Sequence, residues 1–181
     1  MANKKVKINR APVLTLWGTV VAERQGYDRD AALTLGKAVA GLNAQSKGRR
    51  LGIYEERTPE EREKEREKRG EAEEEEYTLA VMGRAVPAVD TDHGMRATTK
   101  GKPIDPGSVR RYLEKKFGDA LPEVQAAMEE LARAYEPRQL AVRAYALYEK
   151  FRPSIPEGKK GWGAEGELDL EYIRSLTKEA D

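Results

Sequence analysis

Few side chains in this sequence could carry acid–base or metal chemistry. The chain has one histidine, His93, and no cysteine, which excludes thiolate nucleophiles, disulfides and zinc sites built from cysteines or several imidazoles. His93 precedes Gly94 in a stretch of turn-forming residues, where a buried acid is poorly placed to orient it as a general base. We therefore expect His93 to be a turn residue and expect no catalytic residue.

Two short motifs match part of a ligand-binding loop. Asp90-x-Asp92 has the opening of a calcium loop, but the sixth and twelfth positions hold Met95 and Gly101, where Gly and Glu are needed. Residues 161–166 read G-x-G-x-x-G, yet no strand precedes them and no helix begins at their end, so the dinucleotide-binding context is missing. An anion held by the loop glycines and the two preceding lysines is the alternative. We predict no metal site, no cofactor and no enzymatic activity.

The strongest functional signal lies between Val20 and Gly36. This stretch resembles a helix-turn-helix, because small Ala22 is followed by a turn at Gly26 and then by regularly spaced apolar residues of a second helix. The resemblance implies that the outer face of the second helix reads a DNA major groove. An ordinary antiparallel helix pair is the structural alternative. The residues expected on or near that outer face are Arg29, Asp30, Thr34 and Lys37.

Positive charge is concentrated in the first third of the chain. Residues 1–53 carry ten Lys/Arg and three Asp/Glu, residues 54–76 carry six and twelve, and residues 77–181 carry seventeen of each. A basic unit of net charge +7 suits a polyanionic partner, whose phosphates pair with Lys and Arg side chains. The acidic run could separate this unit from the rest or lie back on it. The residues expected to contact DNA are Arg29, Lys37, Lys47, Arg49 and Arg50.

A protein-interaction or assembly module is the alternative function. The second helix carries a stripe of small residues that could pack against another chain, together with Leu16 and Trp17. The partner would then be a second copy or another protein instead of DNA. No window approaches the roughly 20 apolar residues of a membrane span, and no signal peptide follows the first residues. We therefore expect no membrane partner and a cytoplasmic location.

The sequence predicts that the elements positioning these residues form an α+β, predominantly α-helical architecture. A basic arm (1–10) precedes an N-terminal helical unit (11–53). A charged linker, helical or disordered, follows (54–76), and a β-hairpin with a helical bundle completes the chain (77–181). We expect the charged run to separate two folding units.

Local signals set the boundaries of these elements. Asp28, Asp105 and Asp169 can cap helices, since a carboxylate accepts hydrogen bonds from the free N–H groups of a first turn. The helix after Asp28 is expected to run to about Lys47. A hairpin turn is expected at residues 90–94. Pro87 is expected at a sheet edge or a bulge because it cannot donate a ladder hydrogen bond.

Overall fold

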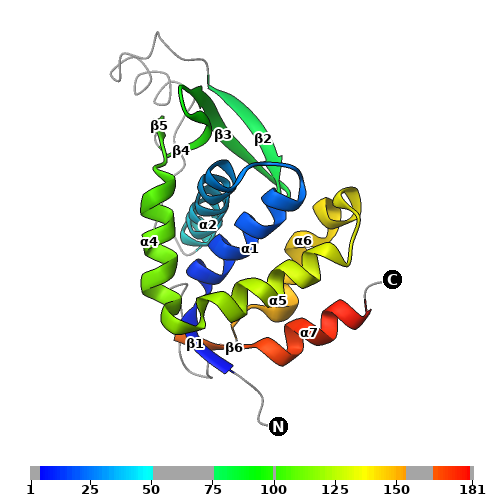
Figure 1. Cartoon of the computed structure of the whole chain (residues 1–181). Coiled ribbons are helices and arrows are strands. Elements are labelled where there is room, and N and C mark those ends of the chain that lie inside the picture. Colours follow the sequence, from blue (N-terminus) through cyan, green and yellow to red (C-terminus); the bar gives the residue numbers. More distant parts are fainter. Residues whose placement is uncertain (1–4, 51–75, 100, 154–164, 180–181) are drawn as a thin grey trace.

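The computed structural model describes residues 5–50, 76–99, 101–153 and 165–179, without the side chains of 43–50, 165 and 179. The fold is α+β and mostly helical, as predicted. A central pair of helices lies between a small sheet and a group of C-terminal helices (Figure 1). All of the predicted charged linker except Glu76 lies outside the described residues, as do the first four residues of the G-x-G-x-x-G loop. The central helices are α1 (Arg10–Arg24) and α2 (Arg29–Arg50).

The two central helices meet through glycine. A Cβ built on Gly18 would lie 2.9 Å from Gly36 Cα, so the two backbones touch at this point. The small stripe of α2 is therefore filled by α1 of the same chain, and the hypothesis that it packs against another chain is wrong. Leu16 and Trp17, proposed for that interface, are completely buried in the chain's own core. Every residue from Pro12 to Ala22 is buried, which makes α1 the centre of the fold.

A four-stranded antiparallel sheet covers α2. Its strand order is β2-β3-β4-β5, and β3 and β4 pack against α2, beside α4. The sequence predicted one hairpin here, and the structure confirms its turn between Thr91 and Gly94. A second turn, at Met82 and Gly83, was missed. The elements are β2 (Tyr77–Val81), β3 (Arg84–Thr91), β4 (Gly94–Thr99), β5 (Lys102–Pro103) and α4 (Pro106–Phe117).

Pro87 lies in β3, a strand that pairs with β2 on one side and with β4 on the other. Its partner in β2 is Thr78, but the ladder between β3 and β4 begins only at Ala88. Pro87 therefore has no partner on the β4 side, in agreement with the expectation that it lies at an edge, and its missing N–H interrupts no β3–β4 pair.

The C-terminal helices cover the other side of α1. Both α5 and α6 contact α1, and α7 packs on α5. Trp17 Nε1 donates to the Ala144 carbonyl oxygen at 2.9 Å, and its ring meets Phe151 edge to face at 5.2 Å. These helices are α5 (Leu121–Arg133, after the short 3₁₀ turn Gly118–Ala120), α6 (Pro137–Phe151) and α7 (Leu170–Glu179).

The predicted basic arm is partly a strand. β1 (Lys5–Asn9) pairs antiparallel with β6 (Glu165–Asp169), and Val6 stands opposite Leu168. Ile8 is 3% exposed, so this strand contributes to the core. Residues 5–9 of the predicted basic arm therefore form a strand of the folded protein.

The helix caps follow the prediction. Asp28 Oδ1 accepts from Ala31 N at 2.8 Å, Asp105 Oδ1 from Gly107 N at 3.1 Å, and Asp169 Oδ1 from Glu171 N at 3.0 Å. Each carboxylate satisfies a backbone N–H that has no partner inside its helix. The α1–α2 turn also forms as predicted, since Gly26 has a φ of +106°.

The hydrophobic core is continuous. Buried side chains of α1 and α2 belong to the same cluster as those of the sheet and of the C-terminal helices. The residues before and after the charged run therefore share one core. The bounds predicted for the four segments stay a prediction. Within the described part of the chain, every helix is too short or too polar to cross a bilayer.

Candidate nucleic-acid interface

Arg29 is engaged in contacts inside the protein. Its Nη1 lies 2.8 Å from Glu23 Oε1 and its Nη2 lies 3.2 Å from Gln125 Oε1. The side chain, 37% exposed, thus ties the start of α2 to α1 and α5. A guanidinium held by a carboxylate has less positive charge to offer a phosphate. Arg29 therefore has a structural role, and its contact with DNA stays a prediction.

The first half of α2 is enclosed on nearly all sides. Residues 31–36 and 38–40 are buried. The expectation that Thr34 lies on an outer face is wrong, because Thr34 is completely buried, donates to the Ala31 carbonyl oxygen and accepts from the Ala97 N–H at 3.0 Å. A recognition helix needs an exposed face to enter a major groove. In this half of α2 only Arg29, Asp30 and Lys37 are partly exposed, since α1, the sheet and α4 cover the rest.

Lys37 is the predicted site residue that reaches the surface between α2 and α4. Its Nζ lies 4.0 Å from the centre of the Tyr112 ring, a cation–π contact. Burial lowers the pKa of Lys37, and the positive charge of Lys116 lowers it further. Lys37 of α2 therefore feels the positive charge of Lys116 of α4. Among the described residues, no carboxylate forms an ion pair with either one.

The last three predicted residues lie near the end of α2. Lys47, Arg49 and Arg50 belong to the helix, but their side chains are outside the described part of the structure. Their contact with DNA stays a prediction.

The exposed face of α4 is a basic surface that sequence reasoning missed. Val109, Leu113 and Phe117 bury one side of this helix. The other side exposes four cations and one carboxylate, Glu114. The signal visible in the sequence is the run Arg-Arg-x-x-Glu-Lys-Lys at residues 110–116. We call these cations, together with Lys37, the α4 basic surface: Lys37, Arg110, Arg111, Lys115 and Lys116.

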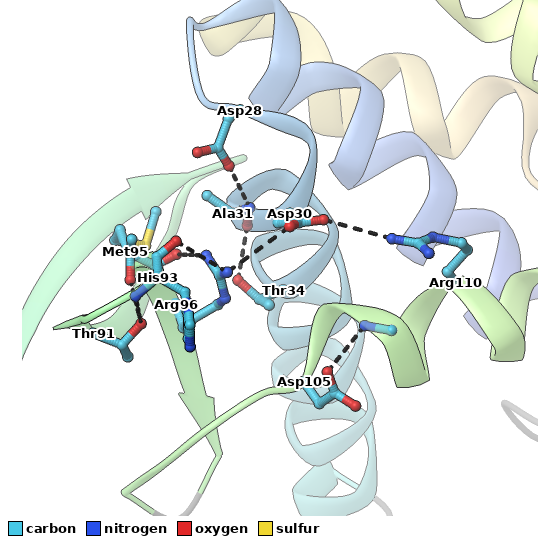
Figure 2. Close-up of polar contacts among 12 residues, drawn as sticks. Asp28, Asp30, Ala31, Thr34, Thr91, His93, Met95, Arg96, Asp105 and Arg110 are labelled. Atoms are coloured by element: carbon cyan, nitrogen blue, oxygen red, sulfur yellow. Dashed lines mark hydrogen bonds and ion pairs between the residues drawn. The ribbon is translucent and has the colours of Figure 1, made fainter.

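A buried arginine fixes the neighbouring hairpin to this surface (Figure 2). Arg96 of β4 is 7% exposed and donates to the Met95 carbonyl oxygen at 2.8 Å and to the His93 carbonyl oxygen at 3.3 Å. Asp30 Oδ2 lies 3.9 Å from Arg96 Nη2, while Asp30 Oδ1 lies 3.6 Å from Arg110 Nη2. One carboxylate of α2 thus links β4 to α4. Arg96 is buried, whereas the Asp30 side chain is about half exposed and is shared between two arginines.

His93 lies in the turn between β3 and β4, where the sequence predicted it. Its ring is exposed at the β3–β4 turn, and its backbone N–H donates to Thr91 Oγ1 at 3.2 Å. The described residues contain no group of three or more metal-ligating side chains.

Comparison with known proteins gives no further guide. The chain matches no family model, no curated protein and no solved structure. The α4 basic surface therefore has to be interpreted from its own chemistry.

Proposed function

We propose that this protein binds duplex DNA through phosphate contacts made by the α4 basic surface, and that it does so without inserting the first half of α2 into a groove. Phosphate contacts give affinity and orientation, whereas base contacts give sequence specificity. A protein that uses only such a surface binds duplexes of different sequence with similar affinity. This proposal keeps the partner expected from the sequence and moves the contact from α2 toward α4.

The observation that carries the proposal is the set of exposed cations on α4, where Arg110, Arg111, Lys115 and Lys116 accompany a single exposed carboxylate, Glu114. Lys37 of α2 contacts the Tyr112 ring of the same helix. Burial lowers the pKa of Lys37, and the positive charge of Lys116 lowers it further. A phosphate bound by these lysines would offset their mutual repulsion and gain charge-assisted contacts. Lys115 and Lys116 are exposed and form no ion pair with any described carboxylate. By contrast, Arg110 and Arg111 are shared with Asp30 and Asp105.

The test is the salt dependence of DNA binding by the full chain. Fluorescence anisotropy with a labelled duplex would be measured from about 50 to about 200 mM salt, where the logarithm of the association constant falls by about 0.9 per decade of salt for each phosphate contact. The double variant Lys115→Gln/Lys116→Gln removes two exposed cations. We expect weaker binding at low salt and a slope that is less negative by about 1.8.

A matched control lies on α6. Arg138 and Lys150 are exposed there, so Arg138→Gln/Lys150→Gln removes the same net charge from another helix. We expect this control to keep the salt slope of the parent protein. Failure to bind duplex at the lowest salt, or equal loss in both double variants, would refute the proposed surface.

A further inference from the structure

The two edges of the four-stranded sheet differ in chemistry. One edge is β5, whose two residues, Lys102 and Pro103, are both exposed. Lysine and proline are the residues that natural sheets use to stop an edge from pairing with another chain. The other edge is β2, Tyr-Thr-Leu-Ala-Val, which has neither proline nor a charged side chain. Only the β5 edge is protected against pairing.

The backbone of β2 can be assigned residue by residue. Val81 pairs with Arg84 across the two-residue turn at Met82 and Gly83, whose φ angles are +51° and +76°. Residues that flank such a turn form a hydrogen-bonded pair, and hydrogen-bonded and non-hydrogen-bonded pairs then alternate along the ladder. The N–H and C=O groups of Thr78 and Ala80 therefore point away from β3. Both residues are exposed, and no described strand pairs with this edge.

We propose that β2 is a homodimerisation edge, on which β2 of a second copy pairs antiparallel about a two-fold axis at Leu79. In this register Thr78 of each copy stands opposite Ala80 of the other. In each copy Thr78 and Ala80 then each donate one backbone hydrogen bond and accept one, which gives four hydrogen bonds in the dimer. Shifted two-fold registers would pair Thr78 with itself or Ala80 with itself and use fewer of these groups. The product is a continuous sheet of eight strands.

Side chains and charge favour the same arrangement. Directly opposed residues lie on the same face of a sheet, so Tyr77 of the second copy stands opposite Val81, an aromatic and β-branched pair that stabilises sheets. Val81 lines a cavity of about 240 Å³ beside the edge, together with Tyr27, Met82 and Ala141, which leaves room for added apolar contact. The Glu76 residues of the two copies lie at opposite ends of the antiparallel pair and are kept apart.

A cysteine at the two-fold axis tests the register. The chain has no cysteine, so Leu79→Cys gives each copy a single thiol. In a non-hydrogen-bonded antiparallel pair the Cα atoms are about 4.5 Å apart, within the range that a disulfide spans. Ala85→Cys is the control: Ala85 pairs with Ala80 inside the sheet, and its counterpart would be three strand spacings away, about 14 Å. We expect mild oxidation to link Leu79→Cys dimers by a disulfide and to leave Ala85→Cys without a disulfide cross-link.

Sedimentation of the full chain tests the association itself. We expect dimers to form within about 1 to 200 µM, the concentration range of weak specific association. Thr78→Lys/Ala80→Lys places lysines opposite each other in the dimer and should raise the dissociation constant at least about tenfold, because opposed like charges destabilise a strand pair. The control Ala126→Lys/Ala146→Lys adds the same charge at exposed sites on α5 and α6 and should leave the dissociation constant of the dimer unchanged.

Three results would overturn the proposal. They are a monomer throughout that range, a dimer equally stable in both lysine variants, and cross-linking of Leu79→Cys no greater than that of Ala85→Cys. Circular dichroism of each variant would establish that it is folded. DNA binding enters none of these measurements, so this inference and the proposed function stand or fall separately.

Discussion

Replacing Gly36 with alanine tests the packing on which the whole fold depends. A Cβ at this position would overlap the Thr15 carbonyl oxygen and lie 2.5 Å from Thr19 Oγ1 and 2.7 Å from Thr19 N. These atoms belong to the backbone and to a buried side chain of α1, which is enclosed on all sides and cannot move alone. Overpacking a core costs about 1–3 kcal/mol, and three contacts below 3.0 Å put this site at the upper end.

The opposing effect is helix propensity. Alanine stabilises a helix interior by about 0.5–1 kcal/mol relative to glycine. The net change for Gly36→Ala is therefore a loss of about 2 kcal/mol in the free energy of unfolding. For a chain of this size that lowers Tm by about 4–8 °C. Urea unfolding followed by circular dichroism at the helix band would measure it.

The same helix supplies the control. A Cβ on Gly41 would meet no atom within 4 Å, and this residue is exposed. Gly41→Ala therefore keeps only the propensity gain, about 0.5–1 kcal/mol, and should raise Tm by a few degrees. The two variants should move in opposite directions. If Gly36→Ala were as stabilising as Gly41→Ala, the helices could not be in backbone contact, and the reasoning would be refuted.

Two further predictions concern polar contacts of the sheet. Thr34→Val leaves the buried Ala97 N–H without its acceptor and should lower the free energy of unfolding in urea by about 1–3 kcal/mol. Thr99→Val, at an exposed site, should stay within about 0.5 kcal/mol of the parent protein. Equal effects of the two variants would contradict the hydrogen bond between Thr34 and Ala97. The hydrogen bond to Asp90 raises the pKa of Tyr77 from 10.0 to about 12, so its stabilisation is complete below pH 10 and is lost as pH rises through about 12. Tyr77→Phe should lack that fall in stability between pH 10 and 12, and indistinguishable unfolding profiles of parent and variant would argue against the bond.

Local signals were read correctly from the sequence. Asp28, Asp105 and Asp169 cap their helices because a cap involves only the next two or three residues. The glycine turn at Gly26 and the hairpin turn before Gly94 are equally local. The close approach implied by the small residues of α2 was also correct, although the partner is α1 and not another chain.

The long-range pairings could not be predicted from the sequence, for a physical reason. Lys5-Val-Lys-Ile alternates polar and apolar residues, a strand signal, yet its partner β6 lies at the other end of the sequence and nothing local identifies it. Thr34 was assigned to an outer face through the helix-turn-helix resemblance, but its hydroxyl donates to the Ala31 carbonyl oxygen and accepts from the Ala97 N–H. The site prediction failed there because a polar residue can be buried when both of its hydrogen-bonding functions are satisfied.

The burial of α1 has a consequence for biosynthesis. This helix is buried on every side from Pro12 to Ala22, and the hydrogen-bond partner of Trp17, Ala144, is 127 residues later in the chain. At a translation rate of about 5–20 residues per second, synthesis of those residues takes about 6–25 seconds. During this interval the apolar side chains of α1 lack the C-terminal helices that cover them in the folded protein. The nascent chain is therefore a strong candidate client for chaperones that shield exposed apolar segments.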